Sequence, residues 1–118
     1  MQDRFKFRFW DKETKTMQKI PTVELRHRVT LDKIFNDDRV IFMQCTGLKD
    51  KDGWLIYEGD VVSDGFDKYV VEWCEYNVQF EFRDLSEEFK VVYTIEQLMP
   101  LEVVGNIYEN PELLKGDD

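Results

Sequence analysis

The sequence has very little of the side chains that catalytic and metal sites use most. Its 118 residues include one histidine, two serines and two cysteines. His27 lies between two arginines in a polar segment, which is typical of a solvated side chain. Ser63 and Ser86 both fall in expected turns, so a Ser–His or Cys–His nucleophile has almost no material. There is also no CxxC pair and no phosphate-binding glycine motif. We therefore expect no catalytic residues, no cofactor and no metal.

Long apolar runs are missing as well. None approaches the roughly 18 to 20 residues that span a bilayer, and residues 1–11 lack the apolar stretch of a signal peptide. Without a route to an oxidising compartment, we expect Cys45 and Cys74 to be buried free thiols in strands, not a disulfide.

Charge is present in excess but is unevenly distributed. The net charge is −9, made of +4 over residues 1–30 and −13 over residues 31–118. The basic N-terminal segment is therefore expected to lie on an acidic body, either its own or that of a neighbouring copy. Because that body repels a phosphate backbone, we expect no direct nucleic-acid binding.

Hydrophobic alternation predicts β-strands along most of the chain. Residues 4–10 place Phe5, Phe7 and Phe9 on one face and Arg4, Lys6 and Arg8 on the other, and residues 16–20 complete a hairpin. Residues 21–30 are expected to connect, and Thr30 to cap a short turn over residues 31–36. Residues 40–45 read as a strand covered on both faces that ends at Gly47.

The second half of the chain predicts a meander of five short strands. They cover residues 61–62, 69–73, 78–83, 89–94 and 102–108, with a 3₁₀-like turn over 95–100 and a final helical turn from 111. This order matches a small SH3-like barrel in which the fifth strand pairs with the first. The predicted fold is mainly β, with an N-terminal region over 1–45 and a barrel over 46–118. The residues expected to form its turns are Gly47, Gly53, Gly59, Asp60, Gly105 and Asn106.

Aromatic residues divide into two groups. Alternation places Trp73, Phe80, Phe82 and Tyr93 in the core, together with Val78, Phe89 and Val91. The aromatics outside this pattern could line an exposed interaction groove: Trp10, Trp54, Tyr57 and Phe66. The alternative, which we favour, is that Trp54 and Tyr57 only cover the open end of the barrel.

Acidic residues gather around residues 50–60 but form no recognisable site. An EF-hand register with Gly53 at position six would place Leu48 and Gly59 at positions that need acidic ligands. Glu58 and Asp60, beside Asp50 and Asp52, could instead provide a carboxylate pair for acid–base chemistry or a Mg²⁺ site. The simpler interpretation is that Asp60 accepts turn amides and marks where the first barrel strand begins.

Three segments resemble the YopX family of phage and prophage proteins. They are KFRFWD at 6–11, MQCTGLKDKDGWLIYEGDVV at 43–62 and VVGNIYENPELL at 103–114. Cys45 and Trp54 depart from the family pattern, and residues 63–98 are only loosely alike. The resemblance implies a mainly β fold with an SH3-like barrel, a phage or prophage origin and hence the cytoplasm of a bacterial host. It carries no assigned activity.

Three functions fit these observations. The first is a non-enzymatic phage accessory module that binds a protein partner or itself as a homo-oligomer. The second is an acidic decoy that imitates nucleic acid and binds a host DNA-handling protein. The third is a small hydrolase that uses a carboxylate pair.

Overall fold

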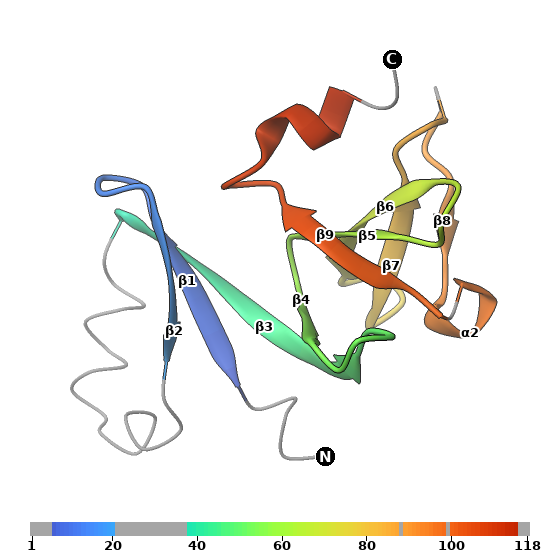
Figure 1. The fold of residues 1–118 in the computed structure, drawn as a ribbon. Coiled ribbons are helices and arrows are strands. Elements are labelled where there is room, and N and C mark those ends of the chain that lie inside the picture. The colour runs from blue at the N-terminus through green and yellow to red at the C-terminus, as the bar shows by residue number, and fades with distance from the viewer. Residues whose placement is uncertain (1–5, 21–37, 88, 99, 116–118) are drawn as a thin grey trace.

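The computed structural model describes residues 6–20, 38–87, 89–98 and 100–115, and its fold is mainly β, as predicted (Figure 1). The described residues form two antiparallel sheets, of order β2-β1-β3-β4 and β8-β7-β6-β5-β9. The strands are β1 (Phe7–Asp11), β2 (Thr16–Ile20), β3 (Val40–Lys49), β4 (Leu55–Tyr57), β5 (Asp60–Ser63), β6 (Lys68–Cys74), β7 (Gln79–Asp84), β8 (Val92–Tyr93) and β9 (Glu102–Asn106). The predicted connection over 21–30, the Thr30 cap and His27 lie outside the described residues, as does the end of the tail, 116–118.

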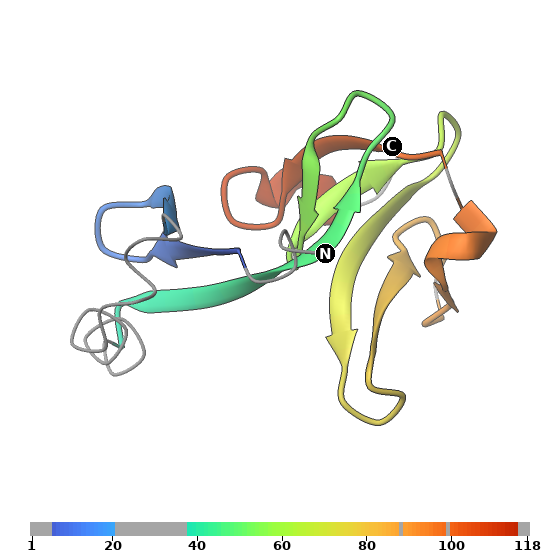
Figure 2. The same ribbon diagram turned by 90° about the horizontal axis from the view of Figure 1, so that it is seen from below.

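The N-terminal hairpin forms as predicted, and β3 joins it to the second sheet. One half of β3 pairs with β1, for example Phe42 with Phe9, and the other half pairs with β4. Figure 2 shows β3 running from the hairpin to the region of the second sheet. The sequence predicted that this strand ends at Gly47, but β3 continues to Lys49. Gly47 has a φ of 84° and lies where the register with β4 shifts, so it forms a bulge inside a longer strand. Because β3 crosses residue 45, the division into 1–45 and 46–118 stays a prediction.

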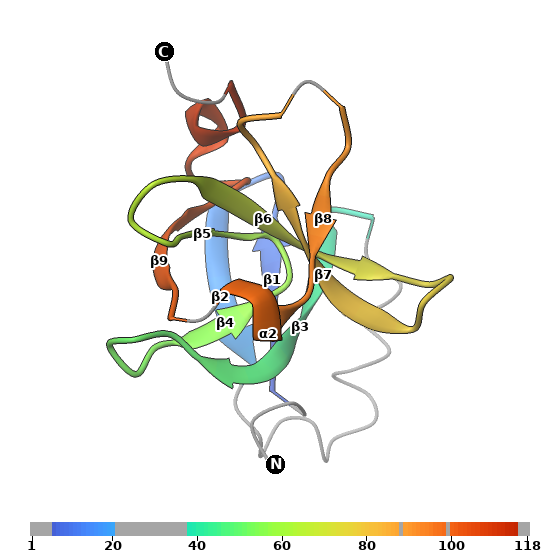
Figure 3. The same cartoon turned by 90° about the vertical axis from the view of Figure 1, so that its right-hand side faces the viewer.

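The second sheet contains the predicted return of the last strand to the first. β9 pairs antiparallel with β5, with Val61 opposite Gly105 and Val62 opposite Val103. The residue between, Val104, is the extra residue of a bulge. The turn before β9 is a single turn of α-helix, α2 (Ile95–Leu98), not 3₁₀ (Figure 3). β9 ends two residues earlier than predicted, and η3 (Pro111–Lys115) is the predicted final helical turn.

The core lies between β4 and the inner face of the second sheet. Its buried members are Ile56, Val62, Tyr69, Val71, Phe82 and Leu101. Ile95 and Leu98 of α2 pack against this cluster and cover one end of the sheet. Phe80, Phe82 and Tyr93 thus take the inward positions that alternation predicts.

Three of the predicted core residues lie elsewhere. Val78 is 71% exposed with a φ of 51°, because the turn after β6 extends one residue further than predicted and β7 begins at Gln79. Phe89 is exposed, because β8 forms only at Val92 and leaves residue 89 in the preceding loop. Trp73 is 41% exposed and packs edge-on against Phe80, so it borders the core and is not inside it.

Both cysteines are thiols; Cys45 is buried as predicted, whereas Cys74 is only half-buried. No helix among the described residues is long and apolar enough to cross a membrane.

Candidate functional site: a buried ion pair and two nearby clefts

A buried arginine connects the hairpin to the second sheet. Arg8 of β1 is only 6% exposed, although alternation predicts it on a solvent face. Its Nη2 donates to Asp60 Oδ1 at 2.6 Å and to the Glu58 carbonyl oxygen at 3.2 Å, and its guanidinium lies 4.7 Å from the Tyr57 ring centroid. The prediction failed because the turn between β4 and β5 covers that face of β1. The charge asymmetry was the available signal, since this contact places the basic hairpin on the acidic body of its own chain.

Asp60 has both predicted roles of a turn residue and one that was not predicted. Its Oδ2 accepts the backbone amide of Tyr57 at 2.7 Å, which fixes the turn where β5 begins, while Oδ1 pairs with Arg8. Burial raises the pKa of the Asp60 carboxyl, and the Arg8 guanidinium partly offsets that effect.

Gly59 is at the centre of this arrangement. It has a φ of 88°, and a Cβ there would lie 3.1 Å from Met43 Sδ and 3.3 Å from the Tyr108 ring. Its amide donates to the Val71 carbonyl oxygen, and its own carbonyl accepts from the Ile107 amide. A residue without a side chain therefore lets β3, β6 and the segment after β9 approach one another here.

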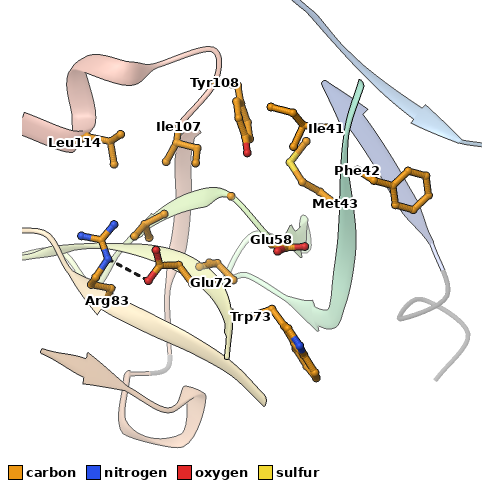
Figure 4. A pocket seen from close by; sticks show the side chains of 13 residues that line it. Ile41, Phe42, Met43, Glu58, Glu72, Trp73, Arg83, Ile107, Tyr108 and Leu114 are labelled. Atoms are coloured by element: carbon orange, nitrogen blue, oxygen red, sulfur yellow. Dashed lines mark hydrogen bonds and ion pairs between the residues drawn. The ribbon is translucent and has the colours of Figure 1, made fainter. Parts of the chain in front are cut away.

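The first cleft, which we call the inter-sheet cleft, is lined in part by Glu58 and Gly59, next to the ion pair in the sequence (Figure 4). Its volume is about 330 Å³, and it lies between β3, β6 and the segment that follows β9. The Glu58 side chain projects into it, with Met43, Trp73 and Tyr108 around it. Glu72 and Arg83 form an ion pair of 3.0 Å at the far end. Burial raises the pKa of the Glu58 carboxyl, and the hydrogen bond from the Gln44 amide and the charge of Arg8 offset part of this increase.

The second cleft, which we call the hairpin cleft, is lined by both members of the ion pair. It has a volume of about 320 Å³ and includes Arg8, Lys19, Trp54 and Tyr57. Asn106 closes one wall, where its Oδ1 accepts the amides of Tyr108 and Glu109 at 3.0 and 2.8 Å. Asn106 is thus a turn residue as predicted. Gly105 instead provides space, since a Cβ would lie 2.6 Å from Asn110 Oδ1.

The acidic residues considered for acid–base chemistry do not converge. Glu58 lines the inter-sheet cleft, whereas Asp60 lines the hairpin cleft and is paired with Arg8. Asp50 is buried elsewhere and accepts the amides of Asp52, Trp54 and Val103 at 2.9 to 3.0 Å. Within the described part of the chain, no three histidine, cysteine or acidic side chains are grouped as metal ligands.

Comparison with protein families matches residues 6–115 to the YopX protein family. The chain belongs to the YopX family. Its fold is similar to that in the crystal structure of protein EF1440 from Enterococcus faecalis, with a TM-score of 0.65 and 27% identity over 92% of this chain and 96% of EF1440. No protein of curated function matches the chain.

The three segments that resemble the YopX family meet at the buried ion pair. The first contributes Arg8, the second contributes Glu58, Gly59 and Asp60, and the third contributes Tyr108. Segments that are far apart in this YopX-family sequence therefore form a single junction that borders both clefts.

Of the four aromatics predicted as an interaction groove in this YopX-family fold, Trp54 and Tyr57 both line the hairpin cleft, whereas Trp10 and Phe66 lie outside its lining. The rings of Trp10 and Tyr108 stack with their centroids 5.8 Å apart, and the Tyr57 ring is buried under the Arg8 guanidinium. Trp54 is 66% exposed beside the hairpin cleft, and Phe66 is exposed in the turn between β5 and β6. They do not form one groove. Sequence reasoning missed the inter-sheet cleft, because its lining comes from three distant segments and its polar members resemble ordinary surface residues.

Proposed function

We propose that this YopX-family protein is a phage or prophage accessory protein that acts by binding a protein partner, without catalysis, in the cytoplasm of a bacterial host. The observation that carries the proposal is the inter-sheet cleft, an opening at the junction of the three YopX-like segments whose lining combines apolar side chains with Glu58, Glu72 and Arg83. Exposed apolar surface bordered by polar groups is typical of sites that contact other proteins.

Binding is favoured over hydrolysis because the carboxylates are separated and one of them is already paired. Acid–base catalysis by two carboxyl groups requires both of them to face the same substrate. Here Glu58 and Asp60 face different clefts, and Arg8 neutralises Asp60. The decoy interpretation has less support, because several acidic side chains are buried in the fold: Asp50, Asp60, Glu81 and Asp84.

A second copy of the chain is one candidate partner. Lys12, Lys15 and Lys19 of the hairpin are exposed, and the body of a second copy would present an acidic surface to them. The proposal thus includes homo-oligomers among the complexes that the protein forms.

The test is affinity capture from prophage-carrying cells with three tagged proteins: the wild type, Trp73→Ala at the cleft and Phe89→Ala as a control. Both substitutions remove an exposed aromatic side chain, but Phe89 lies in the loop before β8. We expect the wild type and Phe89→Ala to retain the same partner, confirmed with purified components, and Trp73→Ala to lose it. Failure of the wild type to bind any partner, itself included, would contradict an interaction role, and retention by Trp73→Ala would exclude the cleft.

A further inference from the structure

We propose that the inter-sheet cleft receives a lysine or arginine side chain from an otherwise apolar segment of the partner, with its charged end at the Glu58 carboxylate. This inference rests on the proposed function, and it names the chemistry that the cleft recognises.

Glu58 carries the negative charge that the cleft offers to a bound cation. Its side chain is half-buried and projects into the cleft (Figure 4). Among the described residues, its carboxylate accepts one hydrogen bond, a long one of 3.4 Å from the Gln44 amide. Arg8 lies nearby but binds the backbone carbonyl of Glu58 and the side chain of Asp60. A carboxylate that is partly removed from water without a bound cation is destabilising, and an incoming cation would offset that cost.

The walls of the cleft suit the uncharged part of a lysine or arginine side chain. Met43, Val71 and Ile107 provide apolar surface suited to the methylene groups of a lysine or arginine. The rings of Trp73 and Tyr108 lie on opposite sides of Glu58 in Figure 4, and aromatic rings attract a nearby cation. A bare metal ion fits less well, since calcium and magnesium need several oxygen ligands and the cleft offers one carboxylate free of an ion pair.

The charge around the cleft is negative. Glu72 and Arg83 cancel each other in the cleft, which leaves Glu58 as its net charge. Residues 31–118, which include all the lining residues, carry −13. This field attracts a basic segment and repels phosphate or a nucleotide, so a cationic side chain is the ligand that complements the cleft.

The test compares two tripeptide probes that differ only by the terminal ammonium group of the central side chain: acetyl-Leu-Lys-Leu-amide and acetyl-Leu-norleucine-Leu-amide. Both are titrated to millimolar concentrations into ¹⁵N-labelled protein, and the amide signals of Gly59 and Tyr108 report occupancy of the cleft. We expect the lysine peptide to shift these signals and the norleucine peptide to bind about tenfold more weakly or not at all. Equal binding of the two peptides, or no shift at these amides, would overturn the proposal.

Substitution of Glu58 by Gln provides the second test, with the exposed Glu87→Gln as its matched control. Glu58→Gln keeps an oxygen for the Gln44 amide but removes the charge, so it should weaken the lysine peptide about tenfold, while Glu87→Gln leaves it unchanged. A purely structural Glu58 predicts the reverse pattern, with lower thermal stability of Glu58→Gln and unaltered peptide binding.

The two proposals fail separately. If the partner depends on Trp73 but the peptides bind equally, the cleft is a docking site that does not select a cation. If the lysine peptide binds through Glu58 while Trp73→Ala still captures the partner, the cation site is real and the partner binds elsewhere.

Discussion

At the residue scale, the Arg8–Asp60 pair determines how the hairpin and the second sheet are held together. Both side chains are more than 90% buried, so their charges have lost most of their hydration. Such a pair contributes little net stability relative to apolar replacements, but removal of one partner leaves an uncompensated buried charge. The pair therefore specifies the position of the hairpin more than it adds to the free energy of unfolding.

The first prediction follows from that asymmetry. Arg8→Met should lower the free energy of unfolding by about 3 kcal/mol, because Asp60 is left buried without its cation. Arg8→Met combined with Asp60→Asn should recover most of this loss, since Asn still accepts the Tyr57 amide. Urea denaturation measures both.

The control for this prediction is Arg83→Met. Arg83 forms an ion pair of similar length with Glu72, but both side chains are at least one third exposed. Its removal should cost less than about 1 kcal/mol. A double variant that is no more stable than Arg8→Met alone would contradict the proposed cause.

Gly59 and Gly53 allow backbone strain to be separated from packing. Both have a φ near 90°, but a Cβ at Gly53 would meet nothing within 4 Å, whereas one at Gly59 would press on Met43 and Tyr108. Gly53→Ala should cost about 1 kcal/mol from the left-handed backbone alone. Gly59→Ala should cost about 2 kcal/mol or more, measured by urea denaturation. Equal losses of unfolding free energy in the two variants would show that β3, β6 and the segment after β9 do not meet closely at Gly59.

Sequence reasoning at this scale found the turn residues but missed the ion pair. Gly53 and Asp60 were identifiable because turn chemistry is local and a glycine or aspartate signals it within four residues. Arg8 was assigned to solvent because alternation shows only which residues share a face. It does not show whether a segment 52 positions away covers that face.

At the element scale, Asp50 joins its own turn to a strand that is far away in the sequence. Its Oδ1 binds amides of its own turn, between β3 and β4, and its Oδ2 binds the Val103 amide of β9. The Lys51 amide donates to the Leu101 carbonyl oxygen beside it. This turn thus positions the start of β9, and with it the pairing of β9 with β5.

The pH dependence of Asp50 provides the third prediction. Burial acts to raise the pKa of Asp50, but the amides of Val103, Trp54 and Asp52 outweigh it and hold the pKa below its ordinary value. A carboxyl with a lowered folded pKa stabilises the fold above its unfolded pKa of about 3.9 and loses that effect as pH falls through the folded value. Asp50→Asn should therefore cost about 2 kcal/mol at pH 7 and progressively less below about pH 4.

Urea denaturation at several pH values measures this difference. Asp52→Asn, in the same turn but exposed, is the control and should stay within about 0.5 kcal/mol of the wild type. A constant gap between the wild type and Asp50→Asn from pH 7 to pH 3 would show that the charge of Asp50 does not support the turn.

Element order followed from the sequence more reliably than element length. The hairpin was predictable because alternation and turn residues are local. The pairing of β9 with β5 was predictable because five short strands in this order match a barrel in which the last strand pairs with the first. Gly47 was read as a strand end because a glycine signals either a turn or a bulge, and only the partner strand decides between them. The predicted start of β7 at Val78 was wrong, because Val78 has a positive φ, which a β-branched residue rarely adopts and which its sequence therefore does not indicate.

At the scale of the whole molecule, charge separation along the chain has an internal and an external consequence. The internal one is the Arg8–Asp60 contact, which places the hairpin on its own body. The external one involves the exposed lysines of the hairpin, Lys12, Lys15 and Lys19, beside a body of strongly negative charge. Two copies could therefore attract each other through these regions, and such attraction is screened by salt.

Sedimentation velocity provides the last prediction. At low ionic strength, the sedimentation coefficient should rise with protein concentration, and the rise should disappear near 1 M salt, where the Debye length is about 3 Å. Lys12→Glu with Lys15→Glu should abolish the association even at low salt. Lys49→Glu with Lys90→Glu changes the net charge equally but alters exposed lysines outside the hairpin, so it should weaken association less. Equal weakening would indicate general repulsion between acidic molecules, and a monomer under all conditions would contradict self-association through the hairpin.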